Sequence, residues 1–159
     1  MRSRHVLGGL LAAAVAVGLA ASPASAATPN GKYRIQVGGQ CAKEIAKGSE
    51  YMIALGNDCS TSTVWNVTTT LTVTTFRSAS SGKCLGVSAP RPHEPTWVTS
   101  KACSDIFARK AWRINEPDSE GFTEISQPFK GRTECLANES RGFLQQDACG
   151  GNTTRLIEV

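Results

Sequence analysis

The chain has 159 residues, of which 17 are basic and 13 acidic, and six are cysteines. This length suits a single domain. So small an excess of positive charge argues against a protein that binds nucleic acid through bulk charge, and the composition also argues against an acidic tail.

The first 26 residues predict a secretory signal peptide. Arg2 and Arg4 precede an almost continuous apolar run over residues 6–21, and Ala24-Ser25-Ala26 supplies a small-residue cleavage site. No later stretch reaches 18 apolar residues, so we expect no membrane insertion. The expected mature chain, residues 27–159, is a secreted single domain with 15 basic and 13 acidic side chains.

All six cysteines lie after the predicted cleavage site. An even number of cysteines in an exported chain indicates three disulfides. A zinc site would need closely spaced ligand pairs, whereas the nearest neighbours, Cys135 and Cys149, are 14 residues apart. His93 is the sole histidine of the expected mature chain. We therefore predict structural disulfides, no metal and no cofactor.

Four series of residues recur in phase along the chain and indicate a threefold internal repeat. They step by 43 to 51 residues, which predicts units at about 33–67, 70–115 and 121–159. We expect the apolar series to lie in the core. The series are the first cysteines Cys41, Cys84 and Cys135; the second cysteines Cys59, Cys103 and Cys149; the closing residues Trp65, Trp112 and Ile157; and, six residues before each second cysteine, Ile53, Trp97 and Phe143.

Short runs rich in Val, Ile, Thr and aromatic residues predict an all-β chain. Examples are residues 64–67, 69–76 and 97–100, each bounded by turn-forming residues. Three units of about four short strands fit a closed barrel with a capping layer of hairpins, which removes exposed sheet edges. Pro90, Pro92 and Pro95 mark a loop inserted in the second unit.

The second unit carries Ser81-Gly82-Lys83-Cys84-Leu85 and Ala111-Trp112-Arg113-Ile114. With three units of this kind, the chain resembles the ricin B-type lectin domain from Tyr33 to Val159. The resemblance implies a β-trefoil, with three pseudo-symmetric repeats that are each stapled by one disulfide. Spacing alone leaves 15 ways to connect six cysteines. The pairing that the resemblance implies is Cys41–Cys59, Cys84–Cys103 and Cys135–Cys149.

The chain departs from the family at every position that holds sugar. The resemblance implies an aspartate two residues after the first cysteine, an aromatic residue two before the second, and an Asn-Gln pair before the closing tryptophan. None of these residues is kept, and the Gln-x-Trp signature is degenerate. The positions are Lys43, Gly86 and Ala137 for the aspartate; Asn57, Lys101 and Asp147 for the aromatic residue; and Ser62-Thr63, Arg109-Lys110 and Thr154-Arg155 for the pair.

The chain lacks the G-x-S-x-G and H-E-x-x-H motifs, so we predict a non-catalytic binding protein. One hypothesis is carbohydrate binding through a non-standard site. The alternative is a protein-binding trefoil, such as a protease inhibitor or a subunit of an exported toxin or adhesion complex, with a secreted or cell-surface protein as partner. The candidate ligand-binding residues are Arg91, His93, Lys101 and Lys110, and their charge predicts an anionic or proteinaceous ligand.

Overall fold

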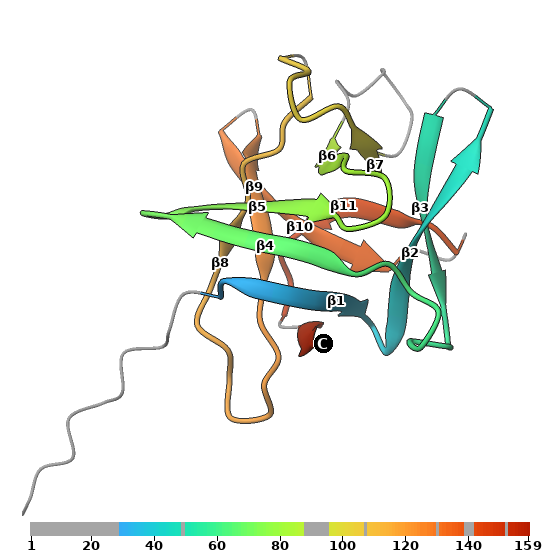
Figure 1. The fold of residues 1–159 in the computed structure, drawn as a ribbon. Helices are drawn as coiled ribbons and strands as arrows, with labels where there is room; N and C mark the ends of the chain where they lie inside the picture. The colour runs from blue at the N-terminus through green and yellow to red at the C-terminus, as the bar shows by residue number, and fades with distance from the viewer. Residues whose placement is uncertain are drawn as a thin grey trace, which may run out of the picture.

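The computed structural model describes residues 29–48, 50–87, 96–106, 108–129, 131–138, 142–151 and 153–159. This part of the chain forms strands and turns with no helix, which confirms the all-β prediction (Figure 1). None of its segments is therefore a helix that could cross a membrane. The predicted signal peptide lies outside the described residues. The strands are β1 (Gly31–Val37), β2 (Gln40–Lys47), β3 (Glu50–Gly56), β4 (Trp65–Thr70), β5 (Val73–Ser78), β6 (Cys84–Val87), β7 (Thr96–Lys101), β8 (Arg113–Ile114), β9 (Ile125–Phe129), β10 (Arg132–Asn138), β11 (Leu144–Ala148) and β12 (Thr154–Glu158).

Seven of these strands close into a barrel. The order runs β1, β2, β3, β7, β6, β5, β4 and back to β1. The closing pair, β3 with β7, is short and joins Tyr51 to Ser100 and Met52 to Thr99. The sheet continues from β7 through β11, β10 and β9 to β8, while β12 pairs with β1. Closure of this kind removes the free edges that isolated strands would expose.

Strand alternation builds a core to which all three predicted units contribute. In β4, Trp65 and Val67 are buried, Asn66 between them is partly exposed and Thr68 after them is exposed, as a period of two requires. Trp65 and Trp112 are fully buried, which confirms their assignment to the core. The core cluster comprises Ile35, Val37, Ala42, Ile53, Trp65, Val67, Phe76, Leu85, Val87, Val98, Trp112, Ile125, Leu136 and Leu144.

The assignment of Ile157 to the core is wrong by one residue. Across β1 and β12, Ile157 stands opposite Arg34, whereas Leu156 stands opposite the fully buried Ile35. Leu156 is the residue of β12 that packs against the core cluster. Because neighbouring residues of a strand face opposite sides, a slip of one position exchanges the inner and outer faces.

The three disulfides pair as the resemblance implied: Cys41–Cys59, Cys84–Cys103 and Cys135–Cys149, with no free cysteine among the six. Each bridge lies within one predicted unit and spans 14 to 19 residues. A loop of that length stabilises the fold by about 3 kcal/mol in the chain-entropy account.

Candidate functional site

Trp97 and Phe143 do not lie in the core, contrary to the sequence prediction. Both side chains are partly exposed, while the residues that follow them, Val98 and Leu144, are fully buried. Ile53, the third member of that series, is fully buried. The first unit has one more residue between its core position and its second cysteine than the other two units. Counting from the cysteine therefore aligned a core residue of one unit with surface residues of the others.

Trp97 and Phe143 instead line an open groove of about 460 Å³, together with Lys47, Glu50 and Met52. We call this the aromatic groove. The two aromatic rings pack edge to face, with centroids 5.8 Å apart and planes at 88°. Edge-to-face packing is a preferred arrangement of two aromatic rings, and both side chains remain partly exposed.

Backbone pairing fixes the walls of the aromatic groove. Met52 belongs to β3, which pairs with β7 at the closing seam of the barrel. Trp97 on β7 stands opposite Gln145 of β11. Phe143 forms a bridge with Ala54 of β3. The groove therefore lies where strands from all three predicted units meet, and its shape rests on sheet hydrogen bonds.

Charged groups stand at the rim of the aromatic groove. The Lys47 ammonium lies 5.1 Å from the centroid of the Phe143 ring, within the range of a cation–π interaction. The Glu50 carboxylate, 57% exposed, accepts a hydrogen bond from the Lys101 ammonium at 3.0 Å. Lys101 thus reaches this rim, but its charge is paired with that of Glu50. Because the carboxylate is more than half exposed, its remaining lone pairs face solvent.

In the second unit, the position implied for the sugar-binding aspartate is tightly enclosed, so a side chain there would require its neighbours to shift. A Cβ atom on Gly86 would lie 3.0 Å from the Arg109 carbonyl oxygen and 3.0 Å from Cγ of Lys110. Val87 and Arg109 exchange backbone hydrogen bonds of 2.9 and 3.0 Å, which hold the two segments together. The Arg109 guanidinium donates a hydrogen bond to the side-chain oxygen of Gln146 on β11. Burial lowers the pKa of Arg109.

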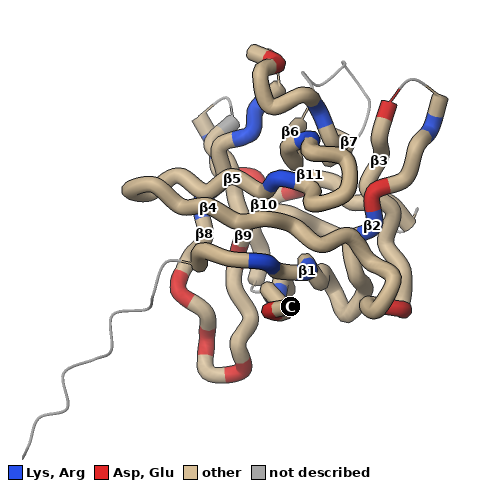
Figure 2. Tube along the Cα trace, in the orientation of Figure 1, with Lys and Arg blue, Asp and Glu red and all other residues tan. Residues whose placement is uncertain are grey.

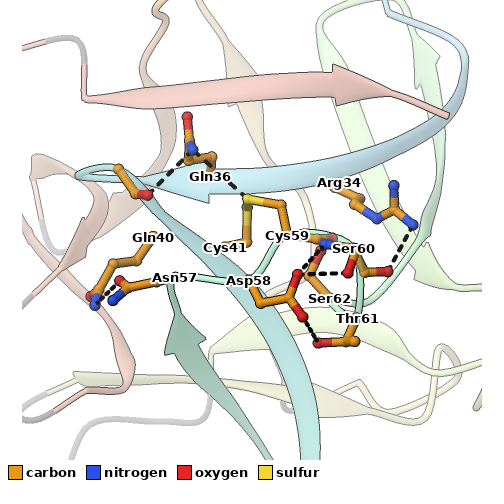
Figure 3. The surroundings of a disulfide bond; sticks show 11 residues. Arg34, Gln36, Gln40, Cys41, Asn57, Asp58, Cys59, Ser60, Thr61 and Ser62 are labelled. Carbon is orange, nitrogen blue, oxygen red and sulfur yellow. Dashed lines mark hydrogen bonds between the residues drawn. A yellow bond between two sulfur atoms is a disulfide. The ribbon is translucent and has the colours of Figure 1, made fainter.

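In the first unit, the positions implied for the aromatic residue and for the Asn-Gln pair are engaged in internal hydrogen bonds. Asn57 accepts a hydrogen bond of 3.0 Å from Gln40 beside the Cys41–Cys59 bridge (Figure 3). The Thr63 hydroxyl accepts one of 2.7 Å from the backbone N–H of Glu44.

The aspartate beside that bridge shapes its loop. Asp58 accepts hydrogen bonds from the Ser60 N–H, the Ser60 hydroxyl and the Thr61 hydroxyl (Figure 3). These hydrogen bonds, first among them that of the Ser60 hydroxyl, lower the pKa of Asp58. The carboxylate therefore stabilises a turn.

In the third unit, the corresponding positions likewise serve the fold. Thr154 is buried, and the Arg155 guanidinium lies 4.3 Å from the centroid of the Phe122 ring. Asp147 accepts a hydrogen bond from the backbone N–H of Ala148. None of the positions that the resemblance implied lines the aromatic groove, although Lys101 pairs with Glu50 at its rim.

Of the four predicted ligand-binding residues, the structure describes Lys101 and Lys110, and Lys110 lines a groove to which Lys101 does not contribute. Arg91 and His93 lie outside the described residues. The Lys110 ammonium donates to the backbone carbonyls of Ala102 and Asp105. The described lining of that groove includes neither Lys101 nor Glu50, the residue with which Lys101 pairs.

Comparisons with known proteins show the fold. No family model matches the chain, and no curated protein matches it. A salivary protein of Culex quinquefasciatus from the Cysteine and Tryptophan-Rich family superposes with a TM-score of 0.67 at 15% identity, covering 87% of this chain and 100% of that one. A ricin B-like lectin of Macrolepiota procera, solved in complex with lactose, superposes with a TM-score of 0.61 at 18% identity, covering 85% and 100%. The chain shares its fold with a ricin B-like lectin.

A third solved structure matches in part of its length. It is a GlcNAcα1-4Gal-releasing endo-β-galactosidase of Clostridium perfringens, with a TM-score of 0.62 at 15% identity, and the match covers 82% of this chain and 33% of that one. At 15–18% identity, these similarities show the fold of this chain and do not identify its ligand.

Proposed function

We propose that this protein is an exported, non-catalytic carbohydrate-binding protein with a β-trefoil fold, and that it holds its sugar in the aromatic groove. The fold is shared with a lectin solved in complex with lactose. Export is supported by the residues typical of a signal peptide and by the pairing of all six cysteines, which is characteristic of an oxidising compartment.

Strand pairing supports the threefold arrangement. Each unit supplies one hairpin with a cysteine on its first strand: β2–β3, β6–β7 and β10–β11. The second strands of these hairpins pair with one another, because β7 contacts both β3 and β11 and a bridge joins Ala54 to Phe143. Three hairpins joined in this way are what a trefoil cap requires.

One observation carries the proposal for the ligand, namely a fixed and partly exposed aromatic pair beside a carboxylate. A sugar ring has an apolar C–H face and a rim of hydroxyl groups. The rings of Trp97 and Phe143 suit the first, and Glu50 can accept hydrogen bonds from the second. Lys47 adds a donor at the rim. A volume of about 460 Å³ lies within the usual range for small-molecule sites.

The test is a glycan array with the oxidised mature chain, followed by calorimetric titration of the best glycan. Trp97→Ala and Glu50→Gln should each weaken binding about tenfold or more, because each removes one side of the proposed contact. Ile106→Ala is the matched control, since Ile106 is 87% exposed and lies outside the groove.

Unfolding temperatures measured alongside separate lost binding from lost folding. A glycan that binds equally well to the parent chain, Trp97→Ala and Glu50→Gln would refute the aromatic groove as its site. An empty array, together with capture of a secreted protein by the same chain, would favour the protein-binding alternative.

A further inference from the structure

A second groove lies on the outer face of the barrel. Cross-strand register places Asn66, Arg77 and Cys84 side by side on β4, β5 and β6. Thr68 of β4 and Thr75 of β5 form the next cross-strand pair on the same face of the sheet. Their neighbours Trp65, Val67 and Phe76 point into the core, so the side chains of this row face outward. The groove has a volume of about 510 Å³, and the row forms its floor.

The segment after β7 forms the opposite wall of this groove. Cys103 is bonded to Cys84, which ties the segment to the floor. Lys110 completes the lining. We call this the basic groove, because Arg77 and Lys110 are the two charged residues among its described lining residues and both are positive.

Arg77 is oriented for binding. Its Nε atom donates to the Gly82 carbonyl at 2.9 Å. Gly82 has a φ of 69°, a left-handed conformation that glycine adopts without strain, and its N–H bonds to the Ser78 carbonyl at 3.0 Å. Within the described part of the chain, no carboxylate forms an ion pair with Arg77. The two terminal nitrogens of an exposed guanidinium are therefore available, in a geometry that matches an oxyanion.

Lys110 adds a fixed second positive charge. Two of its three ammonium donors are directed to the carbonyls of Ala102 and Asp105, which leaves one donor for a ligand. Asn66, Thr68 and Thr75 add an amide and two hydroxyls, which can bond to hydroxyl groups. Figure 2 shows Lys and Arg along β5 to β7 and in the segment that follows, which also carries Asp105, while other acidic residues gather in the loop between β8 and β9.

We propose that the basic groove binds a saccharide that carries an oxyanion, either a sulfate ester or a carboxylate. Arg77 binds the oxyanion with its terminal nitrogens, Lys110 supplies a further donor, and the polar row contacts the sugar hydroxyls. This inference rests on the proposed function for its ligand class, but it concerns a separate groove with no residue in common with the first. The groove is open, so its electrostatic attraction is weakened by salt.

The experiment compares a sulfated oligosaccharide, a uronic-acid oligosaccharide and a neutral oligosaccharide of matched length, by calorimetry at low and moderate salt. A preference for either anionic ligand, lost as salt rises, is expected, and the stronger of the two identifies the oxyanion. Arg77→Gln should weaken that ligand about tenfold. Arg77→Lys, which keeps the charge but loses the planar fork, should give an intermediate affinity.

Arg113→Gln is the charge-matched control, because Arg113 is exposed on β8 and lies outside the basic groove. It should leave affinity unchanged. Equal losses in Arg77→Gln and Arg113→Gln would show that bulk charge attracts the ligand, and equal affinity for the neutral oligosaccharide would show that no oxyanion is recognised. Either result overturns the proposal.

The two proposals fail separately. Trp97→Ala should leave the anionic preference intact, and Arg77→Gln should leave intact any neutral glycan bound in the aromatic groove. Amide shifts in β4 and β5 on titration with sodium sulfate provide a readout that needs no glycan. Their absence, together with unchanged oligosaccharide binding in Arg77→Gln, would also overturn the basic groove as an anion site.

Discussion

Trp65 and Trp112 are both fully buried, and their indole N–H groups differ in one respect. Nε1 of Trp112 donates a hydrogen bond of 3.0 Å to the Leu85 carbonyl. Nε1 of Trp65 is buried and has no hydrogen-bond partner among the residues that the structure describes. Replacing either tryptophan with phenylalanine removes the N–H group, and the side-chain volume lost is the same at both positions. The difference in stability between the two variants therefore reports on the hydrogen bond of Trp112.

The two substitutions should differ in cost. Each creates a cavity worth roughly 1–2 kcal/mol of unfolding free energy. Trp112→Phe also breaks a hydrogen bond and leaves a buried carbonyl short of a partner, which adds about 1–2 kcal/mol. Trp65→Phe removes an unsatisfied donor, which offsets part of its cavity cost. We expect Trp112→Phe to be the more destabilising of the two by about 1–2 kcal/mol.

The assay is urea denaturation followed by far-ultraviolet circular dichroism, with the three disulfides intact and equal slopes verified for all variants. Alanine variants serve as reference points, and either should cost about 3–5 kcal/mol. Equal losses for the two phenylalanine variants, or a larger loss for Trp65→Phe, would refute the assignment of the hydrogen bond.

Two further predictions concern the standard lectin positions and the first disulfide loop. Gly86→Asp, which restores the family's carboxylate, should lower the unfolding free energy by about 1–3 kcal/mol and create no sugar site, because its Cβ would crowd Arg109 and Lys110. Urea denaturation measures the change in stability, and calorimetry tests for sugar binding. A gain of galactose affinity at unchanged stability would contradict this prediction. Asp58 has a folded pKa below its ordinary value of 3.8, so its stabilising effect is complete above that pH and is lost as pH falls through the folded pKa. Asp58→Asn should therefore make stability less dependent on pH below about 4, and acid titrations of the two chains that coincide would argue against this role.

Much of the fold was predictable from spacing and from alternation. Short runs of β-branched residues indicated strands, and the cysteines recurred in phase because each unit closes one hairpin. The resemblance then implied one pairing out of 15, and that pairing is the observed one.

The errors share one physical cause. Spacing along the chain fixes a residue's approximate place, but a shift of one position moves its side chain to the other face of the strand. Ile157 was assigned inward in place of Leu156, and Trp97 and Phe143 were assigned inward in place of Val98 and Leu144. The aromatic groove was missed for the same reason. Aligning the units on the apolar residues Ile53, Val98 and Leu144, instead of on the cysteines, would have placed both rings outward.

The basic groove could not be derived from the sequence. Arg77, Lys110 and the Cys84–Cys103 bridge meet through cross-strand register and through the path of the segment after β7. Neither is set by a local pattern. Lys110 was singled out because it occupies a family position, and the structure gives it a different neighbourhood from that of Lys101.

Each disulfide of this fold joins two cysteines of the same predicted unit, and the first and last strands, β1 and β12, are neighbours. Val159 donates a backbone hydrogen bond of 3.0 Å to Lys32, and β12 lies along β1. Residues 115–121, between the second and third units, are exposed. Joining the two neighbouring strands and opening the chain at that loop would reorder the units without separating any cysteine from its partner. Duplication or exchange of a single unit during evolution would carry its own disulfide with it, so such an architecture can change one wall of a shared groove while the other units stay as they are.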